Sequence, residues 1–222
     1  MNEKIKNILY VLILLLAISY MSGCEQSDTY QDVYSDESEE SRESHDFSDV
    51  TENPIATIEL ANEKTVDIEL YPEKAPNTVA NFISLIESEF YDGLNFHRTI
   101  PGLLIQGGDP YGNGLGGPDY SIEGEFDHNG FDNPITHERG VISMARSQSF
   151  NSAGSQFFIT LSHEPDFDGQ YAGFGQVIDG IEHVDTIANS KTDNSDNPIN
   201  EVIIERMTID TKGYVYPEPI HY

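Results

Sequence analysis

Short apolar segments separated by glycine, proline and asparagine constrain the fold of this chain more than any other feature of its sequence. Residues 55–60 and 65–70 alternate apolar and polar side chains around a turn at 61–64, which predicts the two strands of a hairpin. Similar short runs predict strands at 141–145, 156–161, 173–178 and 202–209. Because many short strands accompany few helices, the pattern favours a mainly β protein built as a closed antiparallel barrel.

Two helices are predicted among these strands. The first covers residues 78–87 and has an apolar face made of Val79, Phe82, Ile83 and Ile86. The second covers residues 181–189 and places on one side Ile181, Val184, Asp185 and Ala188. Pro76 lies just before the first helix, which is a common start signal.

The beginning of the chain has the order of a secretory signal. A short basic start precedes an apolar run at residues 8–18, and two small residues stand just before Cys24. The run is shorter than the about 20 residues that span a bilayer comfortably. Residues 21–24 resemble a bacterial lipobox, although Met21 stands where leucine is usual. We therefore expect residues 1–23 to be a lipoprotein signal peptide and Cys24 to be lipidated.

Stable anchoring by acyl chains requires more than one chain, and a diacylglyceryl thioether on Cys24 would supply two. The alternatives are an ordinary secretory signal cleaved near Gly23 and an uncleaved helical anchor. Cys24 is the single cysteine of the chain, so no intrachain disulfide can form.

Residues 24–53 are polar and acidic. They contain few aliphatic side chains and Arg42 as their only Lys or Arg, so they bury too little apolar surface to offset the entropy of ordering. We expect a disordered tether between the lipid and a domain at 54–211, with a specific acidic interaction tail as the alternative. Residues 212–222 form a C-terminal tail that contains prolines and receives no role.

Charge excludes two classes of partner. The chain has 11 Lys and Arg residues against 39 Asp and Glu residues, a formal net charge of -28. This balance repels nucleic acid, whose phosphates need cations, and it opposes charge-driven binding to anionic membranes. The acidity is explained either by adaptation to high salt or a polyanion-rich cell wall, or simply by a solvated acidic surface with an acidic linker.

Two strings carry the candidate chemistry. NFHRTIPGLLIQGGDP occupies residues 95–110, and GSQFFI occupies residues 154–159. In composition, order and separation they resemble the cyclophilin family of peptidyl-prolyl isomerases, and the resemblance extends from about residue 55 to residue 209. It implies a closed, eight-stranded antiparallel β-barrel capped by two α-helices, with isomerisation of X–Pro bonds as its activity and no cofactor.

Rotation about an X–Pro bond is opposed by amide resonance, a barrier of about 18–20 kcal/mol for peptide bonds in general. A catalyst of this rotation needs an apolar seat for the proline ring, a hold on the flanking backbone and a donor near the imide nitrogen. The resemblance assigns the donor role to Arg98, whose permanent charge and rigid fork suit it, and the second catalytic role to Gln106. The alternatives are a surface salt bridge for Arg98 and a strand-supporting hydrogen bond for Gln106.

The resemblance also implies a groove for the substrate. The seat for the proline ring should consist of Leu103, Leu104, Phe158 and Phe167. Further substrate contacts are expected from His97, Ala145, Arg146, Ser147, Gln156 and Tyr171. For each side chain, ordinary packing or a structural hydrogen bond is the alternative. The neighbouring Phe157 should face the core, since successive side chains of a strand point to opposite faces.

Several positions depart from the family pattern. Leu103 and Leu104 stand where phenylalanine and methionine are usual, and Arg146 stands where asparagine is common. Asp166 occupies a position often held by tryptophan, and Tyr171 replaces a histidine of many members. These departures change the rim of the groove and leave the arginine in place.

Other ligand sites find little support in the sequence. The glycine-rich loop at 109–119 has no following Lys-Ser or Lys-Thr pair, as a phosphate-binding loop requires. His128 and His137 have no partners at metal-ligand spacing. Residues 193–197 resemble a calcium loop in composition but have no central glycine. We therefore expect no metal.

The sequence thus predicts a monomeric, extracytoplasmic prolyl isomerase that is lipid-anchored to the bacterial cell membrane and assists the folding of exported proteins. Its expected partners are proline-containing peptides, unfolded exported proteins and, through Cys24, the membrane, but no nucleic acid. A non-catalytic proline-peptide binding module using the same groove is the main alternative. A purely structural surface lipoprotein is the third.

Overall fold

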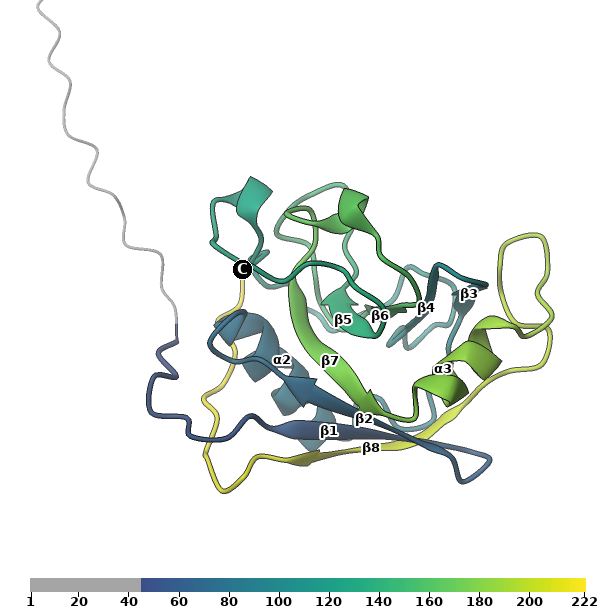
Figure 1. The fold of residues 1–222 in the computed structure, drawn as a ribbon, viewed down its shortest axis with the longest axis horizontal. Helices are drawn as coiled ribbons and strands as arrows, with labels where there is room; N and C mark the ends of the chain where they lie inside the picture. The colour runs from purple at the N-terminus through teal and green to yellow at the C-terminus, as the bar shows by residue number, and fades with distance from the viewer. Residues whose placement is uncertain (1–44) are drawn as a thin grey trace, which may run out of the picture. The chain divides into compact units, whose positions relative to one another are not determined.

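The computed structural model describes residues 45–222 (Figure 1). The expectations for the signal peptide, for Cys24 and for most of the acidic segment lie outside these residues. In chain order the elements are β1 (Ile55–Leu60), β2 (Thr65–Leu70), α2 (Pro76–Glu87), β3 (Arg98–Ile100), β4 (Leu104–Gly107), η1 (Asp127–Asn129), β5 (Val141–Met144), β6 (Phe157–Thr160), η2 (Pro165–Phe167), β7 (Gly173–Asp179), α3 (Ile181–Ala188) and β8 (Ile204–Asp210). No helix among residues 45–222 combines the length and the apolar character needed to cross a membrane.

All eight strands belong to one antiparallel sheet with the order β3-β4-β6-β5-β7-β2-β1-β8. The closed barrel that we expected is not confirmed, because the edge strands β3 and β8 do not pair with each other. β3 has three residues, all of which pair with β4. The sheet is therefore open and curled. The segment before β3 nevertheless meets the start of β8 and the residues before it: Asn95 bridges Ile203, the Gly93 N–H donates to the Ile204 carbonyl at 2.8 Å, and the Phe96 N–H donates to the Val202 carbonyl at 3.0 Å.

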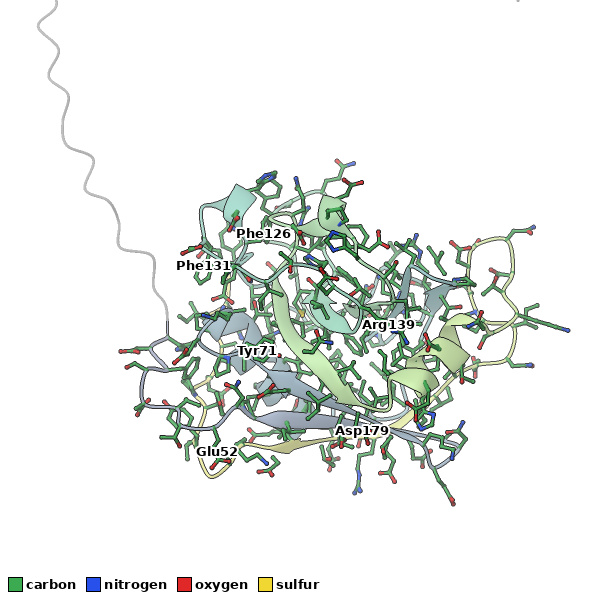
Figure 2. All side chains as sticks on the ribbon, viewed as in Figure 1. Glu52, Tyr71, Phe126, Phe131, Arg139 and Asp179 are labelled. Carbon is green, nitrogen blue, oxygen red and sulfur yellow. The ribbon has the colours of Figure 1, made fainter. Side chains whose placement is uncertain are left out.

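The core lies on the concave side of the sheet. Every second residue of β1 and β2 is buried, as the alternation predicted. The Phe82 ring of α2 lies 5.0 Å from Phe174 and 5.6 Å from Phe157, so helix and sheet meet through aromatic edges. Figure 2 draws the side chains of the described residues on the ribbon. The predicted face of α2 is confirmed, since Val79, Phe82, Ile83 and Ile86 are all buried.

The second helix differs from its prediction at two positions, Asp185 and Ile187. α3 buries Val184, Ile187 and Ala188, whereas Asp185 lies at the surface. Asp185 accepts two hydrogen bonds from Arg139, at 2.9 and 2.7 Å, which tie α3 to the segment before β5. A helical-face pattern could not distinguish these roles, because both Asp185 and Ile187 lie near the edge of the buried stripe.

A buried carboxylate fixes the start of α2. Glu125 accepts hydrogen bonds from the backbone N–H groups of Asn77 and Thr78 at 2.9 and 2.8 Å, and from the Thr78 hydroxyl at 2.6 Å. These are backbone donors that a helix cannot satisfy internally at its first turn. Burial raises the pKa of Glu125 against the lowering effect of these hydrogen bonds. The helix begins at Pro76, two residues earlier than the pattern at 78–87 indicated.

The first residues that the structure describes pack on the C-terminal tail. Phe47, in the segment that we expected to be a disordered tether, is only 3% exposed. Its ring lies 5.2 Å from Tyr216 and 5.9 Å from Tyr214, both in the C-terminal tail. Phe47 is therefore packed against the C-terminal tail although it precedes residue 54, where the sequence predicts the domain to begin. Tertiary contact with a tail far away in sequence decides this, and local composition could not reveal it.

Phe47 should contribute to stability although it lies outside the predicted domain. We expect Phe47→Ala to lower the free energy of unfolding by about 3 kcal/mol, the low end for removal of a buried phenylalanine. Chemical denaturation of the full chain measures this, with the exposed Glu52→Ala as a control that should change stability by less than about 0.5 kcal/mol. Equal denaturation midpoints for Phe47→Ala and wild type would show that the packing of Phe47 does not stabilise the fold.

Candidate active site

A row of side chains crosses four neighbouring strands on the convex face of the sheet. Arg98 of β3 is paired with Gln106 of β4, Gln106 with Phe158 of β6, and Phe158 with Ser143 of β5. Residues directly opposite each other in antiparallel strands place their side chains on the same face. Strand register therefore brings together an arginine, a glutamine and a phenylalanine from distant parts of the chain.

Arg98 stands at the open end of this row. Its side chain is 45% exposed, and its Nε lies 3.9 Å from the Asp196 carboxylate, which is 49% exposed. An ion pair between such solvated groups is weak, so a ligand can draw the guanidinium away at low cost. The surface salt bridge that was the alternative for Arg98 thus exists, and it leaves the arginine available.

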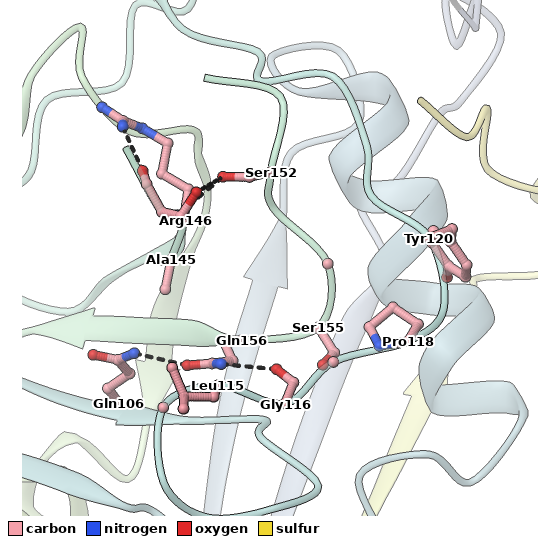
Figure 3. A pocket seen from close by; sticks show the side chains of 14 residues that line it. Gln106, Leu115, Gly116, Pro118, Tyr120, Ala145, Arg146, Ser152, Ser155 and Gln156 are labelled. Atoms are coloured by element: carbon pink, nitrogen blue, oxygen red, sulfur yellow. Dashed lines mark hydrogen bonds between the residues drawn. The ribbon is translucent and has the colours of Figure 1, made fainter. Parts of the chain in front are cut away.

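A chain of amide hydrogen bonds fixes the two glutamines. The Gln106 amide donates to the Gln156 side-chain carbonyl at 3.0 Å, and the Gln156 amide donates to the Gly116 carbonyl at 2.8 Å (Figure 3). Each amide thereby has one orientation. Gln106 is paired with Arg98 in the sheet. The hydrogen bonds therefore connect the glycine-rich loop, through Gln156, to the residue beside Arg98.

A pocket of about 360 Å³ opens beside the row and shares Gln106 with it. Its other walls come from the ends of β5 and β6, from the glycine-rich loop and from Tyr120 (Figure 3). The expected contact residues Ala145, Arg146, Ser147 and Gln156 all line it. Arg98 and Phe158 are not part of its wall, so the groove has two sections that meet at Gln106.

Asp109 shapes the glycine-rich loop. Its nearly fully buried side chain accepts hydrogen bonds from the backbone N–H groups of Tyr111 and Asn113, at 2.8 and 2.9 Å. Burial would raise the pKa of Asp109, but the backbone N–H groups of Tyr111, Asn113 and Gly114, together with the nearby His97, outweigh burial and lower it. The loop thereby presents Leu115, whose side chain is 87% exposed, at the pocket.

Aromatic rings form the other section of the groove. The Phe158 ring lies 5.5 Å from Phe167 and 5.4 Å from Tyr171, in edge-to-face arrangements. Leu104 lies two residues before Gln106 on β4 and therefore on the same face. Leu103 is half-buried in the turn before β4, and Asp166 is exposed. Phe157 points into the core, as predicted.

Arg146 lines the pocket, and its guanidinium is engaged by aromatic rings and by a backbone carbonyl. Its guanidinium carbon lies 5.1, 5.0 and 4.8 Å from the ring centres of Phe126, Phe150 and Tyr171. Its Nε and Nη2 donate to the Gln170 carbonyl at 3.0 and 2.8 Å. Figure 3 shows the guanidinium turned away from the two glutamines. The Arg146 guanidinium thus joins the loop of Phe150 to the loop of Gln170 and Tyr171 at the rim of the pocket, through cation–π contacts and hydrogen bonds.

His97 lies apart from this groove. Its ring is buried, and neither ring nitrogen has a hydrogen-bond partner among the described residues. Burial lowers its pKa, although the nearby Asp109 acts in the opposite direction. Since His97 and Arg98 are neighbours in an extended segment, their side chains point to opposite sides. The structure therefore does not bring His97 into the row.

A buried polar network that the sequence did not predict lies behind Phe158. His137 is fully buried, its Nδ1 lies 2.9 Å from the Asp168 carboxylate, and its Nε2 lies 3.0 Å from the Ser143 hydroxyl. The ring is stacked on Phe158 with centres 6.1 Å apart. Asp168 fixes the imidazole and the imidazole fixes Ser143, so the network supports the aromatic floor. Ser143 is itself buried, which excludes it as a nucleophile in this arrangement.

The two histidines considered as metal ligands have other partners. His137 belongs to the network behind Phe158, and His128 Nδ1 lies 2.6 Å from the Gln170 amide. Among residues 45–222, no group of three or more His, Cys, Asp or Glu side chains is arranged to hold a metal ion.

The curled eight-stranded antiparallel sheet, its two helices and the outward row of arginine, glutamine and phenylalanine define the cyclophilin class of fold. A family model described as cyclophilin-type peptidyl-prolyl cis-trans isomerase/CLD matches residues 55–209. The chain therefore belongs to the cyclophilin-type peptidyl-prolyl cis-trans isomerase family, and it is an isomerase.

Individual relatives agree with this assignment. The chain is 46% identical over 130 residues to peptidyl-prolyl cis-trans isomerase B of Bacillus subtilis, covering 59% of this chain and 87% of the relative. It is 41% identical over 145 residues to an Arabidopsis thaliana isomerase, covering 65% and 89%. A crystal structure of a Cryptosporidium parvum cyclophilin-type isomerase in the presence of the dipeptide Ala-Pro aligns with a TM-score of 0.64 at 36% identity, covering 70% of this chain and 98% of that one.

His137 should make stability depend on pH. Burial lowers its pKa from the ordinary 6.5, against the raising effect of Asp168. As pH falls below 6.5, the unfolded chain therefore takes up a proton at this histidine before the folded chain does. The stability that neutral His137 contributes is present above this pH and is lost as pH falls through the folded-state pKa.

We expect the unfolding midpoint of wild type to fall more steeply between about pH 7.5 and about pH 5.5 than that of His137→Gln. The comparison isolates His137, because His97, Glu125 and the other titrating groups remain in both proteins. Denaturant titrations at a series of pH values measure it. Parallel pH profiles for the two proteins would contradict a depressed pKa at His137.

Proposed function

We propose that this isomerase acts outside the cytoplasm, anchored by a lipid on Cys24, and assists the folding of exported proteins. The strand register that aligns Arg98, Gln106 and Phe158 is the observation that carries the catalytic part of this proposal. The order of basic start, apolar run and small residues before Cys24 supports the anchoring part.

In this proposal Arg98 is the donor to the imide nitrogen. As the X–Pro bond twists, the nitrogen loses conjugation and gains lone-pair character that a guanidinium N–H can stabilise. The planar substrate offers no such lone pair, so the interaction favours the twisted state selectively. The weak pair with Asp196 keeps the guanidinium near the groove without binding it tightly.

The proline ring is proposed to rest on Phe158, with Phe167 and Leu104 beside it. These apolar groups lie on the same side as Arg98, so a ring bound there places its imide nitrogen toward the arginine. Gln106, oriented by Gln156, can hold a flanking backbone carbonyl while the bond turns. His137 holds the floor from behind and does not contact the substrate in this scheme.

The flanking peptide is proposed to run past the pocket that Ala145, Arg146, Ser147 and Gln156 line. Because the Arg146 guanidinium is engaged by three rings and by two backbone carbonyls, it shapes the rim and does not present its charge to the pocket. A monomer suffices, since every residue named here comes from one chain.

Removing the arginine tests the catalytic assignment. A hydrogen bond to a charged group contributes about 1.5–3 kcal/mol, which corresponds to roughly a ten- to hundredfold loss of kcat/KM in Arg98→Ala. Arg98→Lys should recover little activity, because an ammonium lacks the fork geometry. Phe158→Ala should also raise KM. Cis-to-trans rates of X–Pro peptides with the full chain in mild detergent provide the measurement.

Arg206→Ala is the matched control, because Arg206 is another exposed arginine in a surface ion pair, with Glu59 at 3.4 Å. It should keep wild-type rates. Full activity in Arg98→Ala would refute the role of Arg98 while leaving the family assignment intact. Proline-peptide binding by a wild-type protein that does not accelerate isomerisation would instead favour a non-catalytic binding module.

Anchoring is tested separately. If Cys24 carries the lipid, Cys24→Ala should release the protein from the membrane fraction or leave it unprocessed, which a shift in migration reveals. Cys24→Ser, which also lacks the thiol, should behave in the same way. A Cys24→Ala protein that fractionates and migrates like wild type would rule out lipidation at this residue.

A further inference from the structure

The C-terminal tail extends beyond the matched family region and folds back onto the domain. The family model ends at residue 209, whereas the chain continues to Tyr222. In Figure 1 this yellow segment leaves β8, runs back past α2 and ends beside that helix. The tail begins under Phe47, whose ring contacts Tyr214 and Tyr216. We call residues 214–222 the C-terminal strap.

Directed hydrogen bonds hold the strap on α2. The Ile220 N–H donates to the Asn77 side-chain carbonyl at 2.7 Å, and the Asn77 amide donates back to the Ile220 carbonyl at 2.9 Å. The Ser84 hydroxyl donates to Glu218 at 3.3 Å. At the end of the chain, the Tyr222 N–H donates to the Ser121 carbonyl at 2.7 Å. Such reciprocal pairing with a buried asparagine fixes one position of the strap.

The strap reaches the pocket through a stacked pair of rings. His221 lies on Tyr120 with ring centres 3.7 Å apart and planes 8° from parallel. Tyr120 lines the pocket (Figure 3), and its hydroxyl donates to the Asn81 side-chain carbonyl at 2.8 Å. The Asn81 amide in turn donates to the carbonyl of Gly154, another pocket residue, at 2.8 Å. The last residues of the chain thus support one wall of the groove.

We propose that the C-terminal strap determines which peptide residues are accepted next to the proline, with His221 as a positioning residue that acts through Tyr120. The pocket presents amides, hydroxyls and backbone groups, with Tyr120 and Leu115 as its large apolar surfaces. When the strap holds the Tyr120 ring, the pocket keeps a fixed width for an uncharged side chain of the flanking peptide. The inference rests on the proposed use of this groove by proline peptides.

The strap can be loosened without touching Arg98 or the proline seat. The variants are His221→Ala, which removes the ring stack, and a chain ending at Pro217, which lacks residues 218–222. Val215→Ala is the matched control, because Val215 belongs to the strap but is 89% exposed. All proteins are used as the full chain otherwise, and thermal unfolding of each is recorded first.

Two substrates separate specificity from general damage. One is a short blocked peptide with alanine before proline, which occupies only the proline seat; the other is longer and carries glutamine or tyrosine on either side of the X–Pro pair. For the longer peptide, both strap variants should raise KM by about two- to tenfold, the loss expected for one aromatic contact, with kcat unchanged. KM for the short peptide should stay at the wild-type value, and Val215→Ala should match wild type with both peptides.

A merely structural strap would give a different result. Equal changes of KM for the two peptides, or no change for either, would overturn the proposal, whatever the melting temperatures. Calorimetric binding of the same peptides tests the strap independently of turnover. If wild type binds the longer peptide more tightly than the truncated chain but isomerises neither peptide, the strap proposal stands and the catalytic assignment fails.

Discussion

The register between β3, β4, β6 and β5 is the constraint on which the rest of the site depends. It places Arg98, Gln106, Phe158 and Ser143 opposite one another, although they come from four different strands. Side chains alternate along each strand, so a shift of one residue would turn Phe158 into the core and Phe157 outward. The positions of these side chains on the convex face are therefore determined by the hydrogen bonds of the sheet and by the side chains that pack on its concave face.

Packing on the concave face enforces this register. Phe157 is fully buried and contacts the rings of Phe82, Tyr91 and Phe96, with centres 5.6, 5.7 and 6.1 Å away. Displacing so large a buried side chain would cost several kcal/mol, about 3–5 for complete removal of a core phenylalanine. Because successive side chains of a strand point to opposite faces, the burial of Phe157 also keeps the neighbouring Phe158 on the convex face. Its own support combines the aromatic rings of Phe167 and Tyr171 with the hydrogen-bonded network of His137, Asp168 and Ser143.

The rim of the groove is held together by contacts between separate segments of the chain. Arg146 joins the loops that carry Phe150 and Tyr171. The C-terminal strap adds a second support at Tyr120, and Phe47 holds the start of that strap. Segments outside the matched residues 55–209 thus contact each other at Phe47 and contact the pocket residue Tyr120.

The sequence alone determined six of the eight strands, the two helices, the inward Phe157 and the family, because alternation, helical periodicity and two contiguous motifs are local properties. It also named Arg98, Gln106 and Phe158, although only the register shows that they form one row. Four features required the tertiary structure: the open sheet edges, the engaged guanidinium of Arg146, the His137 network and the strap on Tyr120. Each depends on partners far apart in sequence, such as His137 with Asp168 or Phe47 with Tyr216. No local pattern encodes which distant side chain will satisfy a buried polar group or cover an aromatic ring, so packing of the whole chain decides these contacts.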